Sequence, residues 1–253
     1  MSSLQAAGPD ALEDVVALVE GSTRTPGSSL APDVQTWHAS PEQGLSAAIE
    51  CESGAEGGTD ALARLAPSRL TVLASVRSEL AQWAEITRYG DAAPETCLAG
   101  LTYEPGGGVS RLVWLRAPLV PPCRPGFPEG APDARPVLEN YFAALMSSRF
   151  REAAAHFTAD TLYSHPPYGA GTERVLFRGR DALVHGFETD RGPSPARQII
   201  TDLWQQGSRV FVEGVIEGIP DGGSFFSTAS ITSDGAIARY VAFYSATRIP
   251  RPR

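Results

Sequence analysis

The chain repeats one pattern of turns and apolar runs at a spacing of 128 residues. The segment RLTVLASVRSELAQWAEITRYG, which starts at Arg69, aligns without a gap on RQIITDLWQQGSRVFVEGVIEG, which starts at Arg197. At the same spacing YEPGGGVSRLVWLRAP matches ITSDGAIARYVAFYSA, and each segment reads as a strand, a glycine turn and a strand. Upstream, SLAPDVQTWH resembles HFTADTLYSH. The repeat predicts two copies of one small domain.

A proline-rich stretch separates the two copies. PLVPPCRPGFPEGAPDARP, from Pro118 to Pro136, contains seven prolines in 19 residues. Proline fixes φ and lacks a backbone donor, so this composition disfavours a helix or a central strand and favours an extended connector. We therefore predict a first domain at 1–118, a linker at 119–134 and a second domain at 135–253.

The second copy begins with helical spacing and ends with strands. Apolar residues recur at helical spacing from Val137 to Phe157 with a break near Ser147, which predicts two helices. A short strand, TLYSH, and a third helix near Asp181 follow, and QIITDLWQQ, RVFVEGVIEG, SFFSTASIT and IARYVAFYSA read as four antiparallel strands. Each copy is predicted to be an α+β cone with helices packed on a curved antiparallel sheet. Its concave apolar interior suits a small molecule.

Composition excludes several classes of function. All 21 basic residues are arginine, which excludes lysine Schiff-base chemistry. The net charge of -8 argues against a nucleic-acid partner, and no apolar run is long enough to span a bilayer. The first ten residues show no secretory signal, so we expect a cytoplasmic protein. The three cysteines and four histidines lack metal-ligand spacing and GxGxxG is absent, so we predict no metal site and no other cofactor.

A family resemblance is visible in the second copy. VLENYFAALMSSRFREAAAHFTADTLYSHPPYG from Val137, followed by FRGRDALVHGF from Phe177, resembles the opening of the SnoaL-like and ketosteroid-isomerase families, members of the nuclear-transport-factor-two-like superfamily. The resemblance implies a cone fold that binds an apolar small molecule. Single domains of these families commonly dimerise through their sheets. The two copies are therefore expected to form an internal pseudo-dimer, which is compatible with a monomeric chain.

The resemblance also implies catalytic residues. Tyr141 falls where ketosteroid isomerases place a tyrosine that hydrogen-bonds a developing enolate oxygen. His165, in a Tyr-Ser-His-Pro run, falls where they place a carboxylate base, and histidine suits proton transfer at neutral pH. Their second, protonated acid aligns near Ser227 or Thr228, neither of which carries a carboxyl group. This departure argues against steroid isomerisation itself.

The first copy is a degenerate version of the second. Val15 stands at the position of Tyr141, and the segment RTPGSSLAP, rich in helix breakers, replaces the second helix. The first copy keeps a histidine, His38, at the position of His165. Two charged pairs occur at matching positions and are interpreted as inter-strand or interface ion pairs: Glu85 with Arg111, and Glu213 with Arg239.

Several residues of the second copy are candidates to line the cone. Asp202 and Trp204 alternate with Ile200 along one predicted strand, so all three are expected on one face. We predict ligand contacts from these strands and from the tyrosine two residues before the predicted base: Tyr163, Asp202, Trp204, Phe211 and Phe225.

Three functions remain open. The first is a cofactor-independent enzyme of secondary metabolism, in which His165 moves a proton and Tyr141 stabilises an oxyanion on a polyketide-like or terpenoid-like molecule; isomerisation, cyclisation and dehydration are all open. The second is a non-catalytic binding or scaffolding protein, which the missing second acid favours. The third is an epoxide-opening hydrolase or cyclase, which needs two paired acids. Asp202 with Glu213 is the candidate pair.

Overall fold

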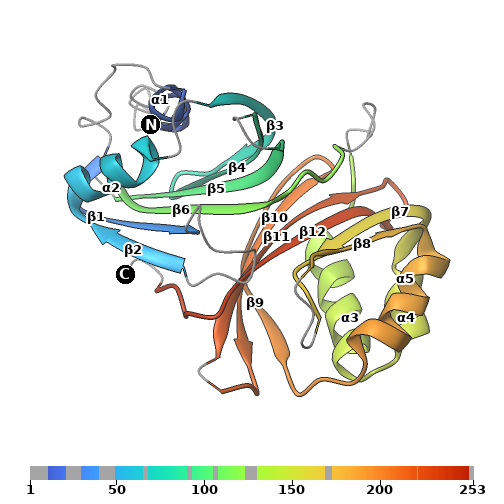
Figure 1. Ribbon diagram of the computed structural model, residues 1–253. Helices are drawn as coiled ribbons and strands as arrows, with labels where there is room; N and C mark the ends of the chain where they lie inside the picture. Colours follow the sequence, from blue (N-terminus) through green and yellow to red (C-terminus); the bar gives the residue numbers. More distant parts are fainter. Residues whose placement is uncertain are drawn as a thin grey trace, which may run out of the picture. The chain divides into compact units, whose positions relative to one another are not determined.

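The computed structural model describes residues 11–20, 30–39, 49–64, 68–89, 93–104, 108–122, 130–168, 173–220 and 222–250. These residues fall into two compact units that divide between Leu119 and Val120. Below, they are called the N-terminal unit and the C-terminal unit. Each contains a six-stranded sheet with helices, which confirms the predicted tandem α+β fold (Figure 1). Residues 123–129 of the predicted linker lie outside the described residues.

The N-terminal unit is built on one sheet with the strand order β2-β1-β6-β5-β4-β3. β1 runs parallel to β6, and the pairs from β6 to β3 are antiparallel. Apolar residues of α1, among them Leu12, Val15 and Val19, pack in one core with this sheet. Residues 24–29 of the predicted helix-breaking segment and the glycine turn at 105–107 lie outside the described residues. The elements are α1 (Ala11–Val19), β1 (Leu30–Ala39), β2 (Ile49–Ser53), α2 (Gly54–Ala63), β3 (Arg69–Arg77), β4 (Ala81–Tyr89), β5 (Glu95–Tyr103) and β6 (Val109–Pro118).

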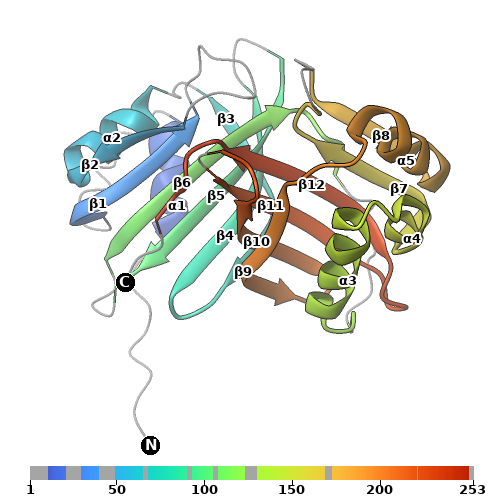
Figure 2. The ribbon, with the colours of Figure 1, turned by 90° about the horizontal axis from the view of Figure 1, so that it is seen from below.

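The C-terminal unit has the equivalent strand order, β8-β7-β12-β11-β10-β9. Figures 1 and 2 place its three α-helices on one face of the sheet. No helix among the described residues of the whole chain has the length and apolar composition needed to cross a membrane. The elements are α3 (Ala134–Met146), α4 (Phe150–Ala155), β7 (Phe157–His165), β8 (Val175–Arg178), α5 (Arg180–Gly186), a π-helical turn (Phe187–Arg191), β9 (Arg197–Gln206), β10 (Arg209–Glu217), β11 (Gly223–Ile231) and β12 (Ile237–Ser245).

Two features of this sheet differ from the prediction. The sheet is mixed, because β7 pairs with β12 in parallel, whereas β9 to β12 are antiparallel as expected. The sequence predicts no strand between TLYSH and the helix near Asp181, yet Val175–Arg178 forms β8 and pairs with the end of β7. A four-residue strand is too short for its alternation to stand out in a sequence rich in glycine and proline.

The register of the two sheets repeats, which supports the internal repeat seen in the sequence. Tyr163 pairs with Tyr240 across β7 and β12, and Thr36 pairs with Leu112 across β1 and β6. Both sheets also contain one extra residue at the same place. Leu73 is skipped in the pairing of β3 with β4, and Thr201 is skipped in the pairing of β9 with β10. Each is a β-bulge, which reverses the alternation of side chains beyond it.

The two faces of the C-terminal sheet carry different side chains. Phe225 packs edge-on against Phe142 of α3, with ring centroids 5.5 Å apart, so its face is the helix-covered face. Pairing and alternation place Ser227, Ala229, Tyr240, Ala242 and Tyr244 on the same face. The opposite face, called the far face below, carries Phe211, Glu213, Phe226, Thr228, Arg239, Val241 and Phe243.

Candidate functional site

Three tyrosine hydroxyls form a chain beneath the helices of the C-terminal unit. The hydroxyl oxygen of Tyr141 on α3 lies 3.2 Å from that of Tyr163 on β7, which lies 3.0 Å from that of Tyr168. Tyr141 and Tyr163 are each 1% exposed, whereas Tyr168 is partly exposed. Sequence reasoning placed Tyr141 and Tyr163 at the site, and the structure brings their hydroxyls into contact. The chain connects a deeply buried tyrosine to a partly exposed one.

His165 lies at the end of β7 beside this chain. Its ring stacks on Tyr168 with centroids 4.4 Å apart. Its Nδ1 lies 2.7 Å from the carbonyl oxygen of Pro166, and its Nε2 lies 2.8 Å from the hydroxyl of Tyr244. A carbonyl can only accept, so Nδ1 carries the proton and Nε2 accepts from the Tyr244 hydroxyl. The Gln198 side chain donates to the same hydroxyl. Nε2 is therefore the basic nitrogen.

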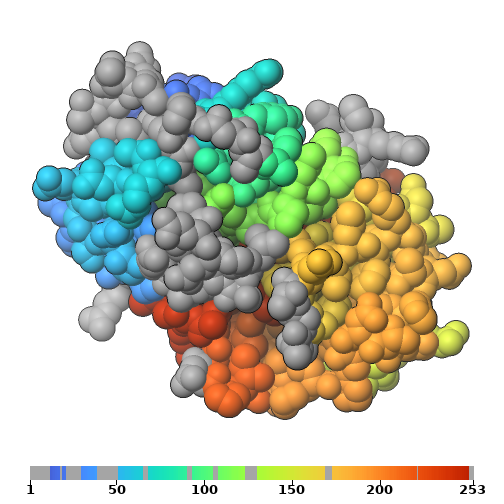
Figure 3. All heavy atoms as spheres, in the orientation of Figure 1, coloured from blue at the N-terminus to red at the C-terminus, as the bar shows by residue number. Residues whose placement is uncertain are grey.

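Aromatic rings surround these polar groups and remove them from water. Tyr163 stacks on Tyr240 with centroids 5.3 Å apart and on His165 with centroids 6.0 Å apart, and Tyr141 meets Phe157 edge-on at 5.0 Å. Figure 3 shows the gold and orange segments that include β8 and α5 at the visible surface of the unit. Burial among aromatic side chains strengthens every polar interaction within this site.

Burial keeps the imidazole and the phenol groups of the site neutral at physiological pH. Burial, together with smaller contributions from nearby Arg174 and Arg191, lowers the pKa of His165 to about 3. Burial also raises the pKa values of the tyrosines at the site: Tyr141, Tyr163, Tyr168, Tyr240 and Tyr244. Among the described residues, the hydrogen-bond partners of the hydroxyl chain and of His165 are all uncharged.

Of the predicted lining residues, Phe225 lies at the site and three others do not. Asp202 pairs with Glu213, and Trp204 pairs with Phe211, which puts all four on the far face. Ile200 instead packs into the core under the helices. The prediction that Asp202 and Trp204 share a face with Ile200 is wrong because the bulge at Thr201 intervenes and reverses the alternation.

The acidic pair proposed for epoxide opening does exist, but not at the site. Asp202 and Glu213 are direct cross-strand partners on the far face, away from Tyr141 and His165. On the same face Arg239 donates from Nε to the carbonyl oxygen of Pro121, 2.9 Å away, and contacts Thr228. Thr228 therefore also lies away from the site, whereas Ser227 faces the helices. This geometry separates the two acids from the tyrosine chain.

Sequence reasoning missed five polar residues of the site. Tyr240 and Tyr244 follow a period of two along β12, and that signal was present in IARYVAFYS. Tyr168 and Gln198 carried no pattern, because their roles depend on contacts between segments far apart in the sequence. Ser227 was considered only as a replacement for an acid. These residues are Tyr168, Gln198, Ser227, Tyr240 and Tyr244.

The N-terminal unit lacks the tyrosines of this site at the equivalent positions that the structure describes. The repeated register places Thr36 at the position of Tyr163 and Leu112 at the position of Tyr240. It places Ala99 at the position of Ser227. His38 is present, but its Nε2 lies 3.5 Å from a guanidinium nitrogen of Arg64. The hydrogen-bond partners of His165, by contrast, are both uncharged. The N-terminal unit is therefore no second copy of the tyrosine site.

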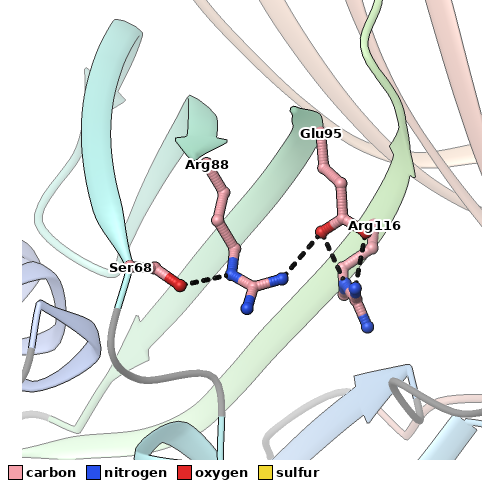
Figure 4. A network of polar contacts seen from close by, with 4 residues as sticks. All are labelled: Ser68, Arg88, Glu95 and Arg116. Carbon is pink, nitrogen blue, oxygen red and sulfur yellow. Dashed lines mark hydrogen bonds and ion pairs between the residues drawn. The ribbon is translucent and has the colours of Figure 1, made fainter. Parts of the chain in front are cut away.

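A charged network replaces the aromatic end of the site in the N-terminal unit (Figure 4). Arg116, at the position of Tyr244, donates to Glu95 at 2.9 and 2.5 Å. Arg88 donates to the same carboxylate at 3.0 Å and to the hydroxyl of Ser68 at 2.8 Å. All three charged side chains are mostly buried. They tie β4, β5 and β6 together.

Comparison with known families agrees with this geometry. Residues 138–245 match the family model of the SnoaL-like domain. The C-terminal unit contains a SnoaL-like domain. The match confirms the resemblance predicted for the second copy and covers less than half of the chain. Its first and last residues lie on α3 and at the end of β12, so the SnoaL-like domain includes both Tyr141 and His165.

Solved structures resemble the chain at low identity. A candidate ketosteroid isomerase from Kribbella flavida is 21% identical, with 47% of this chain and 83% of that chain covered and a TM-score of 0.37. An NTF2-like protein of unknown function from Burkholderia xenovorans is 18% identical, with 47% and 87% covered and a TM-score of 0.36. An epoxide hydrolase/cyclase-like enzyme of pyran ring formation in the polyether salinomycin is 17% identical, with 44% and 90% covered and a TM-score of 0.35. No match was found among curated proteins.

The described residues provide no obvious metal ligands. No three His, Cys, Asp or Glu side chains come together within the part of the chain that the structure describes.

Proposed function

We propose that the SnoaL-like domain is a cofactor-independent acid/base enzyme of secondary metabolism that isomerises, cyclises or dehydrates an apolar, polyketide-like or terpenoid-like molecule. One observation carries the proposal: a neutral imidazole with its basic nitrogen fixed lies beside a chain of three tyrosine hydroxyls inside an aromatic shell. A base and a set of neutral hydrogen-bond donors in a dry site are what proton transfer next to a carbonyl requires. The pseudo-dimer of the two units stays a prediction from the repeat.

The proposed reaction begins with the neutral form of His165. Its Nε2 takes a proton from the carbon next to a ligand carbonyl. The electron pair of that C–H bond forms a C=C bond with the carbonyl carbon, and the π pair of the carbonyl moves onto its oxygen. Tyr141, supported by Tyr163, hydrogen-bonds the resulting oxyanion. The imidazolium then returns its proton to another carbon or to a leaving hydroxyl group. During the first step Tyr244 exchanges its hydrogen bond to Nε2 for one to the ligand.

A proton-exchange assay tests this function without knowledge of the substrate. We expect the protein in D₂O to exchange the α-protons of 1-tetralone, followed by NMR, and His165→Gln to lose this exchange. Tyr141→Phe removes the donor to the developing oxyanion, a loss of about 1–3 kcal/mol of transition-state stabilisation, which is about 5- to 150-fold in rate. Tyr89→Phe is the matched control, because Tyr89 is an exposed tyrosine of the N-terminal unit. Exchange at the same rate in wild type and His165→Gln contradicts the proposal.

One observation favours a second candidate, a non-catalytic binding protein. The basic nitrogen of His165 is already engaged by Tyr244, and burial lowers its pKa to about 3, so the imidazole is a weak base in the free protein. A binding protein holds a ligand by the same hydroxyls without proton transfer. Titration with the fluorescent phenol equilenin separates the two candidates: binding weakened by Tyr141→Phe, together with no exchange of tetralone protons in wild type, favours the binding protein.

A further inference from the structure

Two buried hydroxyls on the helix-covered face make no hydrogen bond of ordinary geometry with any residue that the structure describes. Tyr240 on β12 is 1% exposed and Ser227 on β11 is fully buried. Among the described residues, neither the hydroxyl of Tyr240 nor that of Ser227 has a hydrogen-bond partner. Buried hydroxyls in proteins are nearly always paired, because leaving one unpaired away from water lowers stability. Two such groups on one face therefore need an explanation.

The two hydroxyls lie close together beside the tyrosine chain but outside it. Tyr240 pairs with Ala229 across β11 and β12, which puts Ser227 diagonally next to it on the same face. Burial raises the pKa of Tyr240, and an interaction with the Ser227 hydroxyl lowers it, although the two hydroxyls do not meet the geometry of an ordinary hydrogen bond. The ring of Tyr240 stacks on Tyr163 with centroids 5.3 Å apart and meets Tyr141 edge-on at 5.8 Å. The two groups thus flank the proposed catalytic hydroxyl.

The N-terminal unit shows that the fold does not require these hydroxyls. At the positions of Ser227 and Tyr240 it has Ala99 and Leu112, both buried and both within its apolar core. Apolar side chains therefore occupy the equivalent strand positions in the sheet of the N-terminal unit. A pair of hydroxyls retained at a cost to stability is typical of a binding site.

We propose that Ser227 and Tyr240 form a subsite for one neutral oxygen atom of the ligand, a carbonyl or hydroxyl oxygen. This proposal rests on the SnoaL-like domain being a ligand site, and it adds a second polar contact to the one proposed for Tyr141. Two hydroxyls can both donate to a carbonyl oxygen, or one can donate and the other accept for a hydroxyl group. A neutral oxygen suits the subsite better than a carboxylate, because neither the Ser227 nor the Tyr240 hydroxyl carries a charge that would offset the burial of an ion. The ligand is thus an apolar molecule with at least one neutral oxygen.

Stability measurements on the ligand-free protein give the first test. Ser227→Ala and Tyr240→Phe each remove one unpaired buried hydroxyl, so we expect each variant to melt at a Tm equal to wild type or higher by about 2–4 °C. Tyr163→Phe is the matched control, because it removes a paired buried hydroxyl, and it is expected to lower the Tm. A Tm lowered by both Ser227→Ala and Tyr240→Phe shows that water or protein satisfies these hydroxyls and overturns the proposal.

Binding of a probe pair that differs by one oxygen gives the second test. We expect wild type to bind 2-naphthol more tightly than naphthalene, and Ser227→Ala and Tyr240→Phe each to weaken 2-naphthol by about 5- to 10-fold while naphthalene changes by less than about twofold. The proposal fails if 2-naphthol has no advantage in wild type, or if both variants keep that advantage. Loss of the advantage in Tyr141→Phe alone supports the proposed function and overturns the subsite. Loss in Ser227→Ala and Tyr240→Phe alone supports the subsite and contradicts the role of Tyr141.

Discussion

The Nε2 atom of His165 lies 2.8 Å from the hydroxyl oxygen of Tyr244, and it accepts the only proton that this hydroxyl can donate. Because the opposite nitrogen donates to the Pro166 carbonyl, the ring is locked in one neutral tautomer. The buried pair has direct consequences for the dependence of stability on pH and for the effect of removing either partner.

Stability is expected to fall with acid through His165. The unfolded chain binds a proton at this residue below about pH 6.5, whereas burial lowers the pKa to about 3 in the folded protein. The contribution of His165 is therefore fully present above pH 6.5 and is lost as the pH falls from 6.5 towards 3, with a slope of up to about 1.4 kcal/mol per pH unit. Urea unfolding of wild type and His165→Gln between pH 7 and pH 4 measures the difference. His185→Gln, at an exposed histidine, is the control, and equal slopes in all three proteins contradict the prediction.

Removing the Tyr244 hydroxyl is expected to destabilise the C-terminal unit. Tyr244→Phe leaves Nε2 of His165 and the amide of Gln198 without this partner, which costs about 1–3 kcal/mol of unfolding free energy. Tyr89→Phe changes an exposed tyrosine and is expected to have an effect within about 0.5 kcal/mol. Chemical denaturation at pH 7 compares the two variants. A loss no larger in Tyr244→Phe than in Tyr89→Phe contradicts the hydrogen bond.

The charged network of the N-terminal unit is expected to depend on its one carboxylate. Glu95→Gln leaves the mostly buried guanidinium groups of Arg88 and Arg116 next to each other without the negative charge between them, which costs about 1–3 kcal/mol. Glu52→Gln removes the carboxylate of an exposed ion pair with Arg64 and is expected to cost about 0–1 kcal/mol. Unfolding free energies at low and high salt provide the measurement. The opposite ranking of the two variants contradicts the network.

The two free cysteines that the structure describes are expected to differ in reactivity. Cys97 is fully buried, and burial raises the pKa of its thiol to about 12, so the native protein holds it as an unreactive thiol. Cys51 is exposed, and partial burial and the neighbouring Glu52 raise the pKa of its thiol. Iodoacetamide at pH 9 followed by peptide mass spectrometry is expected to modify Cys51 in native protein and Cys97 only in urea. Equal labelling of both in native protein contradicts the burial of Cys97.

The fold could be predicted from the sequence because its signals are local and repeated. The turn pattern fixed the antiparallel strands β9 to β12 and their counterparts, and the resemblance to known families located Tyr141 and His165. The contacts of these residues were not predictable in the same way. The hydrogen bond between Tyr244 and Nε2 of His165 joins residues 79 positions apart, so no local pattern carries that information.

The feature hardest to predict was the face of the sheet on which a strand residue places its side chain. Alternation along β12 was regular and could have located Tyr240 and Tyr244. Alternation along β9 was misleading for Asp202, because the bulge at Thr201 leaves no mark in a sequence of ordinary strand residues. The hydroxyl of Thr201 donates to the Glu213 carbonyl at 3.0 Å in the folded protein, a contact that becomes visible only once the register is known.

The shared β-bulge also bears on when the bulge arose relative to the duplication of the domain. An extra residue at the same register position in both sheets, Leu73 and Thr201, is explained more simply by inheritance from one ancestor than by two separate insertions. The bulge was then present before the gene segment doubled. The side chains on the helix-covered face differ between the two sheets, with a tyrosine chain in one and an arginine and glutamate network in the other, although both sheets keep the same strand order and the same bulge.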